Sequence, residues 1–193
     1  MKFINRPAVK VPVALKVDVA VIGGGPAGVG AAVTAARNGA STVLVERFGS
    51  LGGSNTNGYM YIIGAERLGE GVGSEICNRL RKGGFLKEVS QMYPDIEANA
   101  LTHYNAGIPL ERLSTSRRRY YSAFDPDMCA CYMNDIMEEN GVTIFLRSLF
   151  VDTVVDNGSI KAVIVENASG NQAISAAITR SQLFATNQPI PTA

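Results

Sequence analysis

The sequence predicts an α/β fold in which a parallel sheet is interrupted by a small antiparallel β-meander. Two short apolar runs rich in β-branched residues, 18–22 and 41–46, flank an alanine-rich helical segment at 27–37, and together they make one β-α-β unit. A glycine-rich turn joins the first run to the helix. Near the C-terminus, two stretches of alternating apolar and polar residues flank Asn157-Gly158, which is a strong hairpin signal.

Composition bounds the classes to which the chain can belong. Its 193 residues are 46% hydrophobic and 18% charged with a net charge of +1, which is typical of a globular chain with one core. The near-neutral net charge gives no positive electrostatic potential that would attract nucleic acid, and no apolar run is long enough to span a membrane. The start of the chain lacks the apolar region and cleavage site of a signal peptide, and three cysteines form no secreted disulfide pattern. We therefore expect a cytoplasmic protein that binds neither nucleic acid nor membranes.

The turn after the first strand has the spacing G-x-G-x-x-G, at Gly23, Gly25 and Gly28. We expect Gly23 to allow a tight turn, Gly25 to let a diphosphate approach bare backbone, and Gly28 to let the helix pack closely on the strand. The phosphates would then lie at the positive end of the helix dipole, where unpaired amide groups point at them. The helix continues to Arg37, and Asn38-Gly39 predicts its end.

Glu46 ends the second strand and is placed to accept hydrogen bonds from the ribose of an adenosine. A carboxylate there repels a 2′-phosphate, which argues against NADP. Glycine-rich turns also occur for structural reasons alone, but here the strand, helix, second strand and terminal acid all occur in register. This register favours a dinucleotide site, with FAD or NAD as the ligand.

Three motifs resemble the FAD-dependent oxidoreductases of the glutathione-reductase-like superfamily, distantly related to fumarate reductase flavoproteins: GGGPAG at 23–28, VER at 45–47 and LGGSNTNG at 51–58. The resemblance implies a Rossmann-like FAD-binding fold, FAD as the cofactor, and a Gly-Gly doublet whose backbone helps to hold the FAD. Taken alone, the segment 51–58 would also suit a flexible surface loop. The cofactor-binding residues that the resemblance implies are Gly23, Gly25, Pro26, Ala27, Gly28, Glu46, Arg47, Gly52, Gly53, Ser54 and, through a backbone group against the adenine, Val151.

Residues 59–124 form a less readable insert. Residues 73–84 predict a short helix with Ser74 as its cap. His103, the only histidine, could serve as a general acid or base, but a histidine in a turn-rich segment is more often incidental. The basic segment Ser114–Tyr121 could bind an anionic substrate or the phosphates of the cofactor, although a solvated face is the favoured interpretation.

A further helix is predicted from Asp125 as N-cap, with Pro126 at the first helical position, to Gly141 as its stop. Cys129 and Cys131 are two residues apart on this helix, so they point to different faces and cannot act as a C-x-x-C redox pair. Neither cysteine has a visible metal-ligand partner. The disulfide-reductase function of the superfamily therefore finds no support, and no metal site is expected.

The chain divides into an N-terminal extension (1–17), a partial FAD-binding domain (18–178) and an atypical C-terminal tail (179–193). Further strands are predicted at 142–146 and 173–178. The resemblance implies a closing apolar strand with an Ala-Thr-Gly-Asp-like turn and then a large substrate domain, and the tail departs from that pattern. We therefore expect a truncated chain that is inactive alone, or one that is completed by another subunit or domain.

Three functional interpretations remain open. The favoured one is an FAD-dependent oxidoreductase that binds the ADP part of FAD through the glycine turn and Glu46, and acts on an unidentified small molecule. The second is a non-catalytic dinucleotide-binding module. The third is an NAD-dependent dehydrogenase, which leaves the Gly-Gly doublet unexplained. No catalytic residue is assigned.

Overall fold

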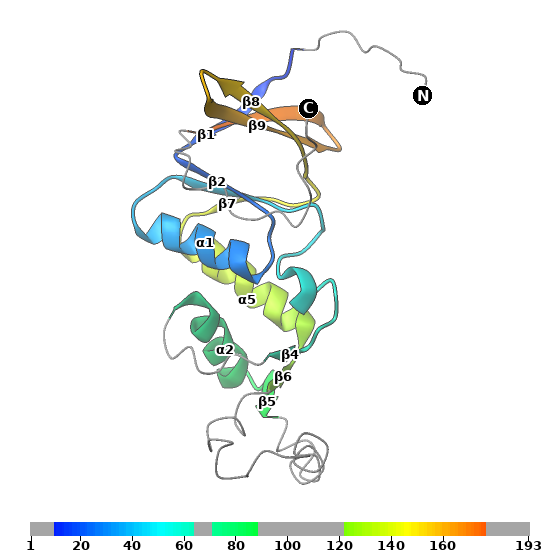
Figure 1. The fold of residues 1–193 in the computed structure, drawn as a ribbon. Helices are drawn as coiled ribbons and strands as arrows, with labels where there is room; N and C mark the ends of the chain where they lie inside the picture. Colours follow the sequence, from blue (N-terminus) through cyan, green and yellow to red (C-terminus); the bar gives the residue numbers. More distant parts are fainter. Residues whose placement is uncertain (1–9, 64–70, 89–121, 177–193) are drawn as a thin grey trace, which may run out of the picture.

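The computed structural model describes residues 10–63, 71–88 and 122–176 (Figure 1). In chain order the elements are β1 (Val13–Val17), β2 (Val19–Ile22), α1 (Pro26–Arg37), β3 (Thr42–Val45), the 3-10 turn η1 (Gly53–Asn55), β4 (Ile62–Ile63), α2 (Val72–Lys82), β5 (Leu86–Glu88), β6 (Ser122–Phe124), α5 (Pro126–Glu139), β7 (Thr143–Phe145), β8 (Leu149–Asp156), β9 (Ser159–Asn167) and β10 (Gly170–Ala176).

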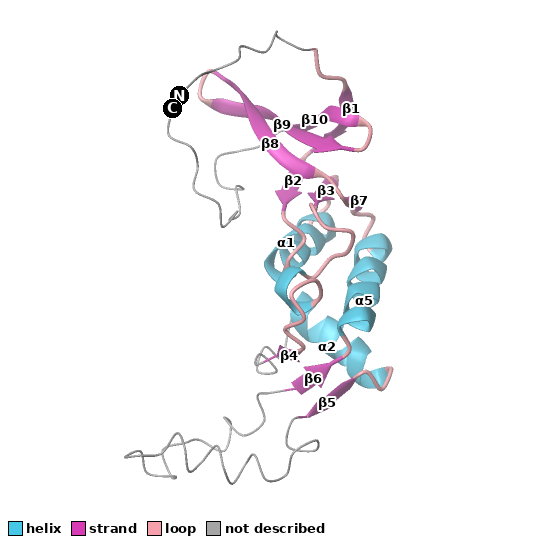
Figure 2. Cartoon of the chain, turned by 90° about the vertical axis from the view of Figure 1, so that its right-hand side faces the viewer, coloured by secondary structure: helices cyan, strands magenta, loops and turns pink. Residues whose placement is uncertain are grey.

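A parallel sheet in the order β2-β3-β7 lies in the middle of the molecule, between two layers (Figures 1 and 2). Helices α1 and α5 cover one face, with α2 beyond them, and the four-stranded sheet β1-β10-β9-β8 covers the other. A small antiparallel sheet, β4-β6-β5, lies at the far end beyond the helices. This arrangement is the predicted α/β fold, a parallel sheet interrupted by an antiparallel meander of β8, β9 and β10.

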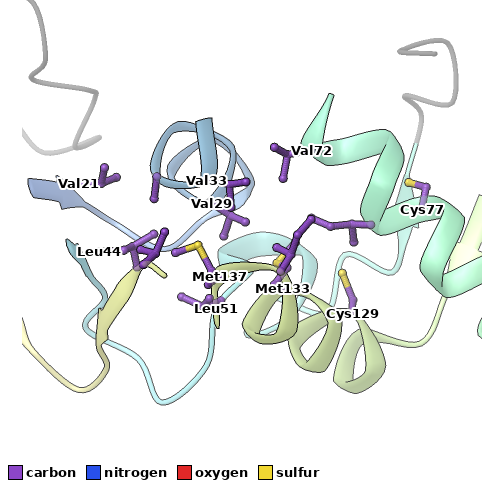
Figure 3. Packing of buried hydrophobic residues seen from close by; sticks show 14 of the residues in the cluster. Val21, Val29, Val33, Leu44, Leu51, Val72, Cys77, Cys129, Met133 and Met137 are labelled. Carbon is purple, nitrogen blue, oxygen red and sulfur yellow. The ribbon is translucent and has the colours of Figure 1, made fainter. Parts of the chain in front are cut away.

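Both faces of the parallel sheet are buried, which explains the continuous apolar runs of its strands. Successive side chains of a strand point to opposite faces. Val21 and Leu44 therefore join the core beneath the helices, where Figure 3 shows them close to α1. Val43 and Val45 join the second core, against the meander sheet.

Helix α1 packs on β2 and β3 through Val29, Ala32 and Val33, which are fully buried. Their spacing of three and four residues is that of one helix face. The helix ends at Asn38, and Gly39 follows with a φ of +86°, as the sequence predicts.

Helix α5 begins as predicted, with the Asp125 side chain as its cap. The Asp125 Oδ1 accepts hydrogen bonds from the backbone N–H of Asp127 at 2.9 Å and of Met128 at 3.0 Å. Gly141 follows the end of the helix with a φ of +68°. Both ends of α5 therefore confirm the sequence pattern.

The expected cap of α2 is wrong. The helix begins at Val72 with Gly71 at the N-cap position, so Ser74 lies inside the first turn instead of before it. Gly71 has a φ of +94°, a conformation that favours glycine, and this lets the chain enter the helix earlier than the hydroxyl pattern suggests.

The meander contains the predicted hairpin. Asn157 and Gly158 join β8 to β9 with φ angles of +48° and +73°, as a two-residue hairpin turn requires. Residues Val13–Val17, within the expected N-terminal extension, form β1 and pair parallel with β10, with Val13 opposite Ala173. The extension therefore contributes a strand to the meander sheet.

Candidate functional site

The glycine-rich turn lies at the carboxyl end of β2, where α/β sheets bind ligands. Gly23 has a φ of +101°, which favours glycine, and its N–H donates to the Val45 carbonyl at 2.8 Å. Gly25 is the N-cap of α1, and Pro26 is the first helical residue. The chain thus passes from strand to helix within three residues.

Gly28 allows the close contact between helix and strand that the sequence predicts. A β-carbon at this position would overlap with the carbonyl oxygen of Gly23 and would lie 3.0 Å from its carbonyl carbon. The obstacle is backbone, which cannot move aside as the end of a side chain can. A glycine at 28 is therefore a requirement of the fold itself.

The N-terminus of α1 is open to a ligand. Among the described residues no side chain caps it, and its first turn contains no acidic residue. A β-carbon on Gly25 would meet no atom of these residues within 4 Å, so their packing does not require glycine there. Pro26 has no N–H, so the exposed first turn presents the amides of Ala27 and Gly28, which have no partner within the helix. This donor set suits an anion such as a diphosphate.

The Gly-Gly doublet packs directly on the glycine-rich turn. The Gly52 N–H donates to the Gly24 carbonyl at 2.7 Å, and a β-carbon on Gly53 would lie 3.1 Å from the Gly25 Cα. Gly52 and Gly53 have φ angles of +103° and +53°. Leu51, fully buried in the core under the helices, anchors the loop that carries them (Figure 3). Two motifs that are far apart in the sequence therefore form one backbone surface.

Two residues of this surface were not singled out from the sequence. Thr56 is buried, and its hydroxyl donates to the Leu51 carbonyl, which closes the loop. A β-carbon on Gly52 would overlap with the Thr56 side chain. At Gly24, a β-carbon would lie 2.7 Å from the Leu51 side chain and 3.0 Å from that of Glu46. The signal for Gly24 was its place in the middle of three consecutive glycines, whereas a threonine in a polar loop gives no signal.

The Glu46 carboxylate is buried, with 5% of the residue exposed, and it ties two loops together. Its Oε2 accepts a hydrogen bond from the Gly24 N–H at 2.6 Å, and its Oε1 accepts one from the Phe48 N–H at 2.8 Å. Each carboxylate oxygen has a second lone pair, so the hydroxyl donors of a ribose are compatible with this arrangement. The role of Glu46 towards a ribose stays a prediction.

Arg47 and Ser54, also expected to contact the cofactor, are both exposed. The Arg47 guanidinium lies over the Phe48 ring, 4.6 Å from its centre. The Ser54 hydroxyl donates to the Asn55 side chain at 3.3 Å. Neither side chain is held toward the turn by a contact that would fix its role.

Val151, the expected adenine contact, lies on β8 and is 41% exposed. The pairing of β8 with β9 shifts between Phe150 and Asp152, so Val151 is the extra residue of a bulge. The start of β8 lies near the carboxyl edge of the parallel sheet, because the Ser148 N–H donates to the Glu46 carbonyl at 2.9 Å. The assignment of Val151 to the adenine stays a prediction.

The opposite end of α1, about 17 Å along the helix axis, has a different character. Glu75 accepts salt bridges from Arg37 at 2.8 Å and from Arg79 at 3.0 Å, and Arg79 also contacts Glu139 at 2.5 Å. Burial alone would raise the pKa of Glu75, but the hydrogen bonds and charges of the two arginines outweigh it and lower the pKa. This network ties α1, α2 and α5 together beside an open groove of about 410 Å³, lined by Arg37, Gly71, Ser74, Glu75, Asn78, Arg79 and Lys82.

The cysteines of α5 lie on different faces, as predicted: Cys129 is buried and Cys131 is exposed. Burial, together with a smaller effect of the nearby Cys77, raises the pKa of the Cys129 thiol to about 12. A thiol with this pKa is a poor nucleophile at neutral pH.

Several sequence-based expectations fall outside the described residues, namely His103, the basic segment Ser114–Tyr121 and the tail 179–193. Within residues 10–63, 71–88 and 122–176, no group of three His, Cys, Asp or Glu side chains could hold a metal ion. Over the same ranges, no helix has both the length and the apolar character needed to cross a membrane.

Comparison with known proteins identifies the family to which the chain belongs. Residues 18–179 match the family described as FAD dependent oxidoreductase. No curated protein sequence matches the chain.

We compare the chain with two of the solved structures that share its fold. L-Amino acid deaminase from Proteus vulgaris is 16% identical, with a TM-score of 0.52 over 88% of this chain and 48% of that chain. L-Amino acid deaminase from Proteus myxofaciens, in complex with anthranilate, is 17% identical, with a TM-score of 0.52 over 88% of this chain and 46% of that one. The chain thus spans about half the length of these two structures. On the family match, the chain belongs to the FAD-dependent oxidoreductases, whose cofactor is FAD.

Proposed function

We propose that the chain binds the ADP part of FAD and that it functions as the nucleotide-binding part of an FAD-dependent oxidoreductase. The observation that carries the proposal is the contrast among the glycines of one surface. Gly24, Gly28 and Gly53 are needed because other parts of the chain press against them, whereas the space in front of Gly25 is open. An open backbone face at the end of an uncapped helix is where a diphosphate is expected.

The diphosphate would be held by backbone groups. The amides of Ala27 and Gly28 at the N-terminus of α1 point along the helix axis, and the helix dipole adds a partial positive charge. The Gly52-Gly53 loop, which packs against Gly25, would form the second wall of the site. Because no side chain within the part of the chain that the structure describes fills the space at Gly25, phosphate oxygens could come within hydrogen-bond distance of the peptide groups.

The adenosine would lie on the other side of the turn, toward the ends of β3 and β7. Glu46 would accept hydrogen bonds from the ribose hydroxyls with the free lone pairs of its carboxylate. A backbone group at the Val151 bulge would lie against the adenine. Arg47 and Ser54 would border the site from its exposed rim.

FAD, when bound, supplies hydride and electron transfer, and the protein positions it and tunes its electronic properties. The described residues contribute positioning of the nucleotide, and we assign none of them to catalysis. We propose that a small-molecule substrate is bound with the help of a completing domain or subunit, in line with relatives about twice as long. A cytoplasmic location remains a prediction of the sequence.

The proposal is tested by purifying the chain and recording its visible absorption spectrum. We expect flavin bands, release of FAD on denaturation, and identification of the released compound as FAD by mass. Apoprotein stripped of flavin should regain the bands with added FAD, and ADP should compete with FAD for the site. FMN, which lacks the adenosine part, serves as the matched control and should bind weakly.

Reduction of the bound flavin separates the remaining interpretations. Turnover with an electron donor and acceptor supports an oxidoreductase in its own right, whereas FAD that no donor reduces supports a non-catalytic binding module. A colourless chain that binds NADH and ignores FAD would contradict the proposal.

A further inference from the structure

Arg147 has an unusual backbone conformation at the edge of the candidate site. It follows β7, at the same carboxyl edge of the parallel sheet as Gly23 and Glu46. Its φ is +50°, in the left-handed region that side chains larger than glycine rarely adopt. Such conformations persist where surrounding contacts over-determine them, and they concentrate at functional sites.

Two contacts of Arg147 with other described residues reach the loop after β3. Its backbone N–H donates to the Phe48 carbonyl at 2.9 Å. Its guanidinium packs against Gly49: a β-carbon at that position would lie 3.3 Å from Nε and 3.6 Å from Nη2. Arg147 is exposed and forms no salt bridge within the part of the chain that the structure describes. Its planar group is therefore used for packing on bare backbone.

These contacts lead directly to the Glu46 carboxylate. The peptide groups of Phe48 are held on both sides, since its carbonyl accepts from Arg147 and its N–H donates to the Glu46 Oε1 at 2.8 Å. The Glu46 Oε2 then accepts from Gly24 in the glycine-rich turn. A continuous chain of hydrogen bonds thus runs from the end of β7 to the turn at the end of β2.

We infer that Arg147 is a positioning residue for the nucleotide: it clamps the loop 47–49 so that the Glu46 carboxylate is held in one orientation toward the ribose. The inference rests on the proposed binding of FAD. It assigns a role to a residue outside the glycine turn, the terminal acid and the Gly-Gly doublet. Without the guanidinium on Gly49, the loop 47–49 keeps only the backbone hydrogen bond from residue 147 to the Phe48 carbonyl, and the looser loop gives the Glu46 carboxylate rotational freedom that ribose binding must then remove.

The test compares Arg147→Ala with Arg147→Lys and with the parent chain, each stripped of flavin and titrated with FAD and ADP. We expect Arg147→Ala to weaken both ligands about tenfold, the loss expected when one hydrogen bond to a charged group is weakened. Arg147→Lys should lose nearly as much affinity. Lysine keeps the positive charge, but it lacks the planar group that packs on Gly49. Unchanged affinity for FAD and ADP in Arg147→Ala would overturn the inference.

Two further measurements separate positioning from general structural support. The first uses 2′,3′-dideoxy-ADP, which lacks the ribose hydroxyls and should bind the parent chain and Arg147→Ala equally. The second is a double-mutant cycle with Gly49→Ala, whose β-carbon would lie 3.3 Å from the Arg147 Nε and so pushes the guanidinium outward slightly. Gly49→Ala alone should weaken FAD by less than Arg147→Ala does, and it should add nothing in the Arg147→Ala background. Fully additive losses, or an equal loss with the dideoxy ligand, would contradict a clamp acting through Glu46.

Arg147→Gly separates a loss of stability from a loss of binding. Glycine adopts the left-handed conformation without cost, so the thermal midpoint of the apoprotein should rise above that of Arg147→Ala, whereas FAD binding should stay as weak as in Arg147→Ala. Asn157→Gly, at the positive φ of the distant hairpin turn, is the matched control and should leave FAD affinity unchanged. If the parent chain binds neither FAD nor ADP, the proposed function itself fails, and the role of Arg147 falls with it.

Discussion

A single methyl group at Gly25 should strongly weaken the binding of FAD and leave the fold intact. The φ and ψ angles of Gly25 are −67° and 176°, which alanine adopts readily, and its β-carbon would meet no atom of the described residues within 4 Å. Gly25→Ala therefore places a methyl group in the space that we propose for the diphosphate. The variant separates a requirement of the ligand from a requirement of the protein.

The expected size of the effect follows from the geometry. Alanine is a poorer N-cap than glycine, which destabilises the apoprotein by about 1 kcal/mol. Alanine also lowers the conformational entropy of the unfolded chain, which stabilises the apoprotein by a similar amount, so the two effects nearly cancel. The methyl group keeps the phosphate out of hydrogen-bond distance of the first-turn amides. Losing two charge-assisted hydrogen bonds costs about 3 kcal/mol, or roughly 100-fold in affinity.

The assay is a titration of apoprotein with FAD, beside urea unfolding of the same samples without flavin. Gly30→Ala is the matched control, because Gly30 lies in the same helix and a β-carbon there also meets nothing within 4 Å. It should leave FAD affinity unchanged and stabilise the apoprotein by about 1 kcal/mol. Gly28→Ala, whose β-carbon would overlap with the Gly23 carbonyl, should destabilise the apoprotein by about 3 kcal/mol or prevent folding.

The reasoning fails on either of two results. Parent-like FAD affinity in Gly25→Ala would mean that the diphosphate does not lie at this turn. Equal stability of the Gly28→Ala and Gly30→Ala apoproteins would mean that helix and strand are not in the contact described.

Three other predictions concern the surroundings of the site. Thr56→Val leaves the buried Leu51 carbonyl without its hydrogen-bond donor, so the free energy of unfolding in urea should fall by about 1–3 kcal/mol. FAD should also bind more weakly, because the Gly-Gly loop loosens, and a variant as stable as the parent chain would refute this prediction. Thiol titration of the native chain at pH 8 should modify Cys131 rapidly and Cys129 only after unfolding, and fast labelling of both would contradict the burial of Cys129. The pKa of Glu75 is lower in the folded chain than its unfolded value of about 4.3, so its ionised form stabilises the fold above that pH. This stabilisation is lost as the pH falls through the folded pKa. Glu75→Gln removes the titrating group, so the urea midpoint of this variant should decline less steeply below about pH 5 than that of the parent chain.

The sequence was most informative where short-range physics decides the structure. The turn from β2 to α1 follows from sterics within six residues, so the spacing of Gly23 and Gly28 predicted both the positive φ and the close contact. The cap of α5 is equally local, because the Asp125 side chain reaches only the next turn. In both cases the necessary partners are neighbours in the chain.

The sequence was least informative where partners come from distant elements. Ser74 has the chemistry of a cap, but Gly71 already permits the entry into α2, and a polar pattern does not show which residue comes first. The hydrogen bond from the Arg147 N–H to the Phe48 carbonyl forms because the ends of β3 and β7 are adjacent, which only the assembled sheet reveals. Nothing in a polar loop indicates that the Thr56 hydroxyl turns inward.

The parallel pairing of β1 with β10 has a consequence for how the molecule forms. Val13 is synthesised well before its neighbour Ala173, with β2 to β9 in between. During translation β1 must therefore remain without this partner strand until β10 has been made, and an unpaired strand can be bound by a chaperone during that interval.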